Sequence, residues 1–369
     1  MSYKSIETLQ ATLKDSVFNY AADARKAAGR SLGTMIEIIT YYMLRDWGYS
    51  GYTAIERGLP EYGNSEITHN VEFTLHPICR RAKVKGLNAP LTSSKIMRSI
   101  SEEIDVDAYS SKKGNSVLDS NDVLRNSCLL AENNTKLVIA NLVKDGEVDV
   151  SVLHQSPFCM IECKRVGVEE GCKKGPQTIE KAKQGAYVAQ MTSSLQKVWS
   201  DDGKRLGFIY NDGKPIVKPY DELLEDVVDD NSLLHDFILS VGIVSNHGNW
   251  FTAENQNKEM KVLAQAYDWL LFLTDEGLST FVEELLLNPQ SKYKAVREAF
   301  TRSYPKTKGN EFTKTKISKE AHEALCNYFA THRKKIEKWF NVIAPANHCI
   351  SDLRNMLFTL ANKKWEEIL

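Results

Sequence analysis

The stretch that decides the fold starts at Glu147-Val148-Asp149-Val150 and ends at Met160-Ile161-Glu162-Cys163-Lys164-Arg165. It predicts two adjacent β-strands, the first with an acid and the second with an acid-x-lysine triplet. Because strand side chains alternate between faces, we expect Glu162 and Lys164 on one face and Ile161 and Cys163 in the core. Pairing of the two strands would bring Asp149 to the face of Glu162. Two carboxylates beside an ammonium suit a hard divalent cation and the hydrolysis of a phosphodiester.

The residues around this stretch predict the α/β fold class, with a central mixed β-sheet flanked by helices. Residues 136–143 and 147–154 are expected to form a hairpin across Lys144-Asp145-Gly146, and 158–165 the central strand. The pattern also predicts an extended segment at 71–75, a long helix over 177–199, and further sheet strands at 205–210 and 238–246.

The flanks predict mainly helical structure, from apolar residues at helical spacing. Three parts follow: an N-terminal, mostly helical part (1–130), a catalytic α/β core (131–250) and a C-terminal helical region (251–369) for dimerisation or DNA contact. The expected helices span 4–28, 34–47, 92–104, 254–274, 277–287, 291–303, 317–340 and 350–366.

Composition excludes several classes of protein. No apolar run approaches the ~20 residues of a membrane helix, and Met1-Ser2-Tyr3-Lys4-Ser5-Ile6-Glu7 lacks the apolar core of a secretion signal. An odd number of cysteines, seven, predicts a reducing cytoplasm rather than a disulfide scaffold. The net charge of −1 means that nucleic-acid binding would depend on local basic patches.

The hairpin, the series Asp149…Glu162-Cys163-Lys164 and the helix after it resemble the PD-(D/E)xK nuclease superfamily, and within it the type II restriction endonucleases. The resemblance covers about residues 136 to 210. Val148 stands where that family has its proline. The resemblance implies that Asp149 and Glu162 bind Mg²⁺ and that Lys164 positions the attacking water. It also implies double-stranded DNA as substrate, 5′-phosphate ends and a homodimer, whose symmetry would match that of the DNA site.

Two further residues resemble parts of the family. Many members carry a glutamate on an N-terminal helix that completes the metal shell, and Glu37, between Ile36 and Ile38, resembles it. The alternative is a capping box, in which Glu37 bonds the backbone N–H of Thr34. Gln184 precedes Tyr187 on a helix similar to that of a related exonuclease branch, one residue short in spacing. It would contact a phosphate or the metal-bound water, or belong to an ordinary amphipathic helix.

Basic residues follow the catalytic strand and recur in the loop 304–316. They suit phosphate binding, whose affinity comes from released counterions, although solvated loops explain them equally well. The candidate DNA contacts are Arg165, Lys173, Lys174, Lys181, Gln184, Lys306 and Lys308.

Other chemistries are poorly supported by the sequence. Cys159, Cys163 and Cys172 lack the spacing of zinc knuckles, and no Gly-x-x-x-x-Gly-Lys-Ser/Thr loop supports an ATP motor. Two rival functions remain: a structure- or end-specific nuclease of repair or phage defence, and a DNA-binding protein that has lost the reaction.

Overall fold

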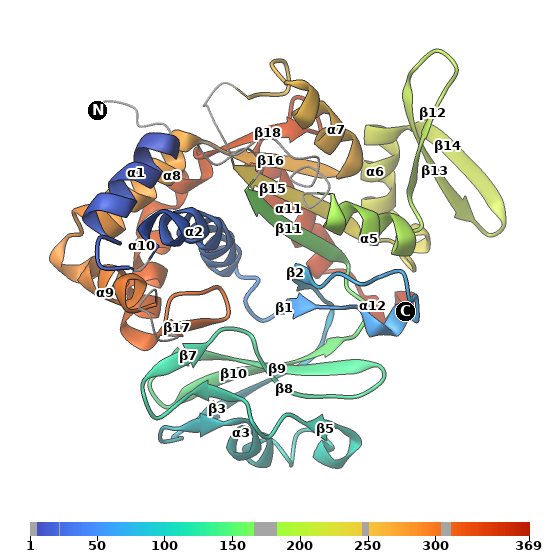
Figure 1. Cartoon of the computed structure of the whole chain (residues 1–369). Coiled ribbons are helices and arrows are strands. Elements are labelled where there is room, and N and C mark those ends of the chain that lie inside the picture. The colour runs from blue at the N-terminus through green and yellow to red at the C-terminus, as the bar shows by residue number, and fades with distance from the viewer. Residues whose placement is uncertain (1–5, 22, 166–182, 246–250, 304–310) are drawn as a thin grey trace.

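The largest sheet of the protein is built from strands that lie far apart in the sequence. A computed structural model describes residues 6–21, 23–165, 183–245, 251–303 and 311–369. The strand order of this sheet is β1-β2-β11-β15-β16-β18 (Figure 1). Its strands are β1 (Thr53–Arg57), β2 (Val71–Leu75), β11 (Cys159–Arg165), β15 (Leu239–Ser245), β16 (Trp269–Leu273) and β18 (Phe340–Ala344).

The centre of this six-stranded sheet is parallel. β11 pairs in parallel with β15, and β15 pairs in parallel with β16, whereas β2 and β18 run antiparallel to their neighbours. Every residue of β15 and β16 is buried. Strands buried along their whole length are typical of parallel strands covered on both faces.

Helices cover both faces of β11, and its residues alternate between them as predicted. Ile161 and Cys163 join the core that includes α2 (Ala24–Asp46), whereas Met160 packs with α5 (Gln184–Thr192) on the other face. Glu162 lies on the α5 side, where its Cβ closely approaches Gly185. The sheet therefore presents the acid-x-lysine face to α5.

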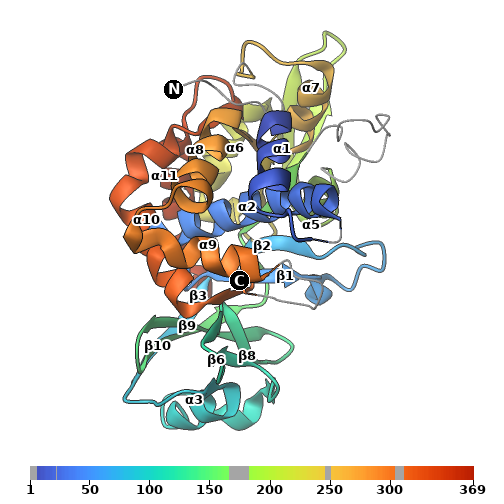
Figure 2. The same ribbon diagram turned by 60° about the vertical axis from the view of Figure 1, so that its left-hand side comes forward.

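A second, five-stranded sheet lies below the first in Figures 1 and 2, with the order β3-β10-β9-β8-β5. The predicted hairpin is confirmed as β9 and β10, but the expected pairing of β10 with β11 is wrong, because β10 lies between β3 and β9. The bounds are β3 (Ile78–Lys85), β5 (Ser110–Ser111), β8 (Cys128–Glu132), β9 (Lys136–Lys144) and β10 (Glu147–His154).

The two sheets are joined at two neighbouring breaks between strands, one between β2 and β3 and the other between β10 and β11. β2 leads into β3 across His76-Pro77, and β10 leads into β11 across a turn that contains Pro157. The backbone N–H of His154 donates to the carbonyl of Pro77 at 2.9 Å, which ties the two breaks together. Proline has no N–H for a ladder and marks strand ends. β3 and β10 therefore pair in the five-stranded sheet, and the strands on the other side of the two breaks, β2 and β11, pair in the six-stranded sheet.

Two small sheets complete the β structure of the described residues. The segment 205–210, predicted to extend the central sheet, instead lies in β13 of a separate three-stranded sheet. The three-stranded sheet contains β12 (Gln196–Trp199), β13 (Arg205–Asn211) and β14 (Lys214–Pro219). The four-stranded sheet contains β4 (Leu91–Thr92), β6 (Ser116–Leu118), β7 (Val123–Arg125) and β17 (Lys316–Ser318). The α/β class is confirmed, but the sheets are several rather than one.

Helix boundaries differ from the prediction mainly where short apolar runs turned out to be strands. The run Trp269–Leu273, predicted as helix, is β16, because periodicity does not separate a buried strand from a buried helix over five residues. The helix expected from Thr34 already begins at Ala24, with Asp23 as its N-cap, and α5 ends at Thr192. The remaining helices are α1 (Ile6–Ser16), α3 (Ser93–Ser99), α6 (Tyr220–Asp229), α7 (Lys258–Ala266), α8 (Asp275–Val282), α9 (Lys294–Arg302), α10 (Lys319–Glu337), α11 (Ile350–Ala361) and α12 (Trp365–Ile368).

All three predicted parts of the chain supply strands to the six-stranded sheet, and the division into domains stays a prediction. Among the described helices, none combines the length and the apolar character needed to cross a bilayer.

Candidate active site

The acid-x-lysine triplet forms an ion pair on β11 in which the carboxylate is buried and the ammonium is partly exposed. Lys164 Nζ lies 2.7 Å from Glu162 Oε1, and the Glu162 side chain is almost fully buried. An exposed ion pair on a strand, the simplest alternative, therefore does not describe these residues. A buried carboxylate needs compensating charge and hydrogen bonds, and Glu162 has both.

Glu72 on β2 is the second carboxylate of the site, and the sequence analysis missed it. Phe73 is the register partner of Ile161, so Glu72 follows beside Glu162 where the strands part. The Glu72 backbone N–H donates to Glu162 Oε2 at 3.2 Å, and Glu72 Oε1 lies 3.7 Å from Lys164 Nζ. The sequence signal for Glu72 is an acidic residue within the short apolar run 71–75. An apolar run of this kind predicts a buried strand, and an acidic residue in it is then buried too.

Asp149 does not join this pair, which corrects the predicted arrangement. It lies on β10 in the five-stranded sheet, opposite Lys83 of β3. Its side chain is about half exposed, and its carboxylate is 3.9 Å from Lys83 Nζ. The physical reason is the break before β11, which gives β10 a different neighbour from β11. The carboxylate that accompanies Glu162 thus comes from the partner strand and not from the preceding one.

Glu37 approaches the site from α2. Since α2 begins at Ala24, Glu37 lies in the middle of the helix, and the capping-box alternative is wrong. Its Oε2 is 3.2 Å from Lys314 Nζ, and the same ammonium lies 2.8 Å from Glu72 Oε1 and 3.1 Å from Glu56 Oε1. Lys314 thus links the carboxylates of Glu37 and Glu56 to that of Glu72.

The charges of the central pair are stabilised by each other. Burial alone would raise the pKa of Glu162, but hydrogen bonds from His69 and the charge of Lys164 hold that pKa below its usual value. Burial would lower the pKa of Lys164, yet the carboxylates of Glu162 and Glu72 raise it. Glu162 is therefore ionised and Lys164 protonated near neutral pH.

Glu37 behaves differently, since burial and the nearby charge of Glu72 raise its pKa to about 7, against the opposing effect of Lys314. Between pH 4.5 and 7 the folded protein then holds a proton that the unfolded chain has lost, so folding stability falls as the pH rises. We expect Glu37→Gln to remove this loss, which is at most about 3 kcal/mol. Urea unfolding of both proteins in EDTA from pH 4.5 to 8 measures it, and parallel pH profiles would contradict it.

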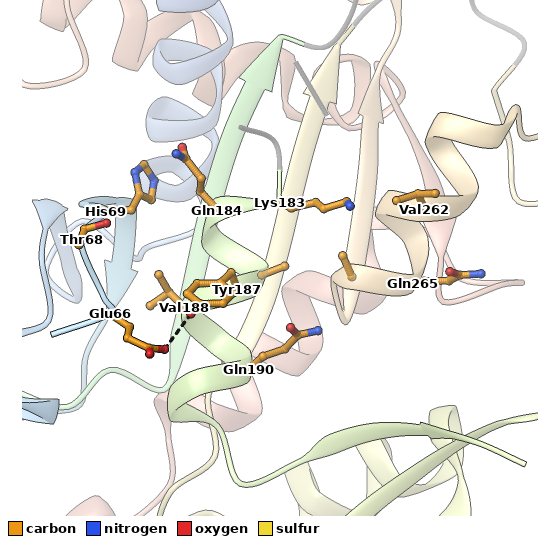
Figure 3. Close-up of a pocket in the computed structure, with 12 residues that line it drawn as sticks. Glu66, Thr68, His69, Lys183, Gln184, Tyr187, Val188, Gln190, Val262 and Gln265 are labelled. Atoms are coloured by element: carbon orange, nitrogen blue, oxygen red, sulfur yellow. Dashed lines mark hydrogen bonds between the residues drawn. The ribbon is translucent and has the colours of Figure 1, made fainter. Parts of the chain in front are cut away.

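A pocket of about 520 Å³ opens beside the site on the α5 side (Figure 3). His69 lines it and reaches Glu162 Oε1 at 2.9 Å, so the pocket adjoins the central pair. Gln184 is half-buried and points into the same space, and Tyr187 Oη donates to Glu66 Oε2 at 3.1 Å. The structure thus places the predicted Gln184 next to the acid-x-lysine strand.

The close approach of α5 to β11 requires glycine at position 185. A Cβ on Gly185 would lie 2.8 Å from Glu162 Cβ and 3.4 Å from Glu162 Oε2. We expect Gly185→Ala to displace the carboxylate and to lower DNA cleavage by about tenfold to a hundredfold. Single-turnover cleavage rates measure the effect.

The matched control is Gly33→Ala in α2, where an added Cβ meets nothing within 4 Å. This change should leave the cleavage rate unchanged and raise helix stability by roughly 0.5–1 kcal/mol. Equal cleavage rates for the two variants would show that the contact at position 185 does not position Glu162.

The remaining predicted DNA contacts are not placed here. Lys173, Lys174, Lys181, Lys306 and Lys308 lie outside the described residues, and of Arg165 only the strand position is described. Their roles stay predictions.

The donors at the site fit a hard divalent cation, although the carboxylates currently surround ammonium groups. Among the described residues, no three His, Cys, Asp or Glu side chains already form a metal shell. However, Glu72 Oε2 is buried and has no hydrogen-bond partner among these residues. A buried carboxylate oxygen without a partner is costly, and Mg²⁺ binds such oxygens. Glu72 and Glu162, with Glu37 nearby, are therefore the residues that would hold the ion.

Comparison of the chain with protein-family models, curated proteins and solved structures found no match.

Proposed function

We propose that this protein is a Mg²⁺-dependent endonuclease of restriction type, which hydrolyses phosphodiester bonds in double-stranded DNA at a specific sequence and leaves 5′-phosphate ends. One observation carries the proposal: Glu162 is buried at the end of a central parallel strand and pairs with Lys164, with Glu72 on the adjacent strand beside it. This combination supports a restriction-endonuclease-like core within the six-stranded sheet.

Glu72 and Glu162 would hold Mg²⁺, and Glu37 would support the ion or its water. The ion, when bound, polarises a phosphoryl oxygen and acidifies a water molecule. The Glu72 N–H fixes one oxygen of Glu162, and His69 and Lys164 contact the other, so the carboxylate is preorganised. Fixed charges of this kind need no rearrangement during the reaction.

Lys164 would orient the attacking water and stabilise the charge that develops on the phosphoryl oxygens. Its raised pKa supports this role over proton abstraction, because a protonated amine donates hydrogen bonds and accepts none. His69 lines the pocket and contacts Glu162, so it would lie between the substrate and the carboxylate.

The DNA would contact the site from the pocket side. Gln184 is available there for a phosphate or for the metal-bound water. Arg165 and the lysines near it in sequence would bind backbone phosphates, so affinity should fall steeply with salt. A homodimer on a two-fold symmetric site belongs to the same proposal.

Incubation of supercoiled plasmid DNA with purified protein tests this function. We expect discrete linear fragments with Mg²⁺ and none with EDTA, and end sequencing should reveal one recurring motif with 5′ phosphates. A smear or trimmed ends would indicate the structure- or end-specific rival. Retention of DNA in a gel without strand scission would indicate a non-catalytic binding protein.

A further inference from the structure

Lys314 is the most deeply buried cation of the site, and no part of the proposed reaction uses it. Its side chain is 5% exposed, and its ammonium contacts the carboxylates of Glu37, Glu56 and Glu72. Burial of an ammonium is costly unless it is fully paired. Three carboxylates around one cation are a ligand set that would otherwise suit a metal ion.

The backbone around Lys314 is fixed from both sides. Asn126 Nδ2 donates to the Lys314 carbonyl at 2.9 Å, and the Asn126 N–H donates to the carbonyl of Thr315 at 2.9 Å. Phe312 is fully buried and forms a β-bridge with Ile317 across the turn. The turn therefore fixes the backbone from which the Lys314 side chain reaches the three carboxylates.

The charge of the cluster leaves room for one divalent ion. When all four carboxylates (Glu37, Glu56, Glu72 and Glu162) are ionised they carry −4, and the ammoniums of Lys164 and Lys314 carry +2, which leaves −2. One Mg²⁺ balances this charge, whereas two would exceed it by +2. Sites with as many carboxylates often hold two metal ions that clamp the attacking and leaving oxygens.

We propose that Lys314 is a built-in cation that takes the place of a second metal ion, so that each chain binds a single divalent ion. The inference rests on the proposed function for the existence of that ion. Glu72 is shared: its Oε1 pairs with Lys314, and its Oε2, which has no hydrogen-bond partner in the described part of the chain, is left for the ion. The C-terminal part of the chain thereby supplies positive charge to a site whose other residues lie on α2, β1, β2 and β11.

Titration calorimetry with Mn²⁺ on the full chain tests the proposal. We expect one ion per chain for the wild type, two for Lys314→Met, and one again for Lys314→Met combined with Glu37→Gln, which removes a ligand of the second ion. Lys316→Met, two residues away at the start of β17, is the control and should bind one ion.

Two ions on the wild type, or one on a folded Lys314→Met variant, would overturn the inference while leaving Mg²⁺-dependent cleavage intact. No ion on the wild type together with no cleavage would overturn the proposed function itself. If Lys314→Met is unfolded in EDTA, recovery of its native circular dichroism with Mn²⁺ would support the exchange of one cation for another. Failure to recover would count against it.

Discussion

Replacing Glu162 by glutamine is expected to lower the rate of DNA cleavage on the order of a thousandfold, which corresponds to about 4 kcal/mol of transition-state stabilisation. Glutamine keeps the shape of the side chain but removes the charge that Lys164 and His69 both contact. It also replaces a carboxylate oxygen by an amide that binds a divalent ion weakly. Single-turnover cleavage of plasmid DNA in saturating Mg²⁺ measures the rate.

The matched control is Glu367→Gln. Glu367 also pairs with a lysine, with Lys364 Nζ at 3.0 Å, but both side chains are largely exposed. Exposed pairs contribute little, so this variant should cleave as the wild type does. Thermal unfolding of both variants separates lost chemistry from lost folding. Wild-type cleavage by Glu162→Gln would remove this residue from the proposed reaction and the proposed function with it.

The face of the strand that carries Glu162 and Lys164 could be predicted because it depends only on alternation over three residues. The contact of Cys163 Sγ with Thr40 Oγ1 of α2 confirms the orientation of the opposite face. Glu37 lies near the site although its helix was expected to begin ten residues too late, since its place among isoleucines does not depend on where the helix starts, and its role stays a prediction. The local sequence pattern is sufficient to predict the strand face of Glu162 and the apolar surroundings of Glu37.

Strand order could not be predicted in the same way. Asp149 was chosen because β10 precedes β11 in the chain, but neighbours in a sheet are set by packing over long sequence distances. Glu72 and Lys314 are 242 residues apart and share a hydrogen bond of 2.8 Å. No periodicity relates such residues, so the partners of a site remain open until the fold brings them together.

Glu72→Gln and Asp149→Asn therefore form the decisive pair of variants. We expect Glu72→Gln to lower cleavage at least about a hundredfold, because it removes a candidate metal ligand and the carboxylate nearest to Lys314. We expect Asp149→Asn to stay within about threefold of the wild type, as is usual for a partly exposed residue whose only ion pair is long. Single-turnover rates over a range of Mg²⁺ concentrations measure both.

The two variants carry the same change of charge, so their difference tests which strand accompanies β11 in the reaction. Loss of activity in Glu72→Gln alone could reflect the unpaired Lys314 ammonium rather than the metal, and two measurements separate these causes. If the ammonium is responsible, Glu72→Gln should unfold at a lower temperature in EDTA, and Mg²⁺ should not restore cleavage at any concentration. If metal binding is responsible, higher Mg²⁺ should recover part of the rate. The reverse order, with Asp149→Asn inactive and Glu72→Gln active, would place the chemistry on the five-stranded sheet, where the described structure pairs the acid with the cation of Lys83.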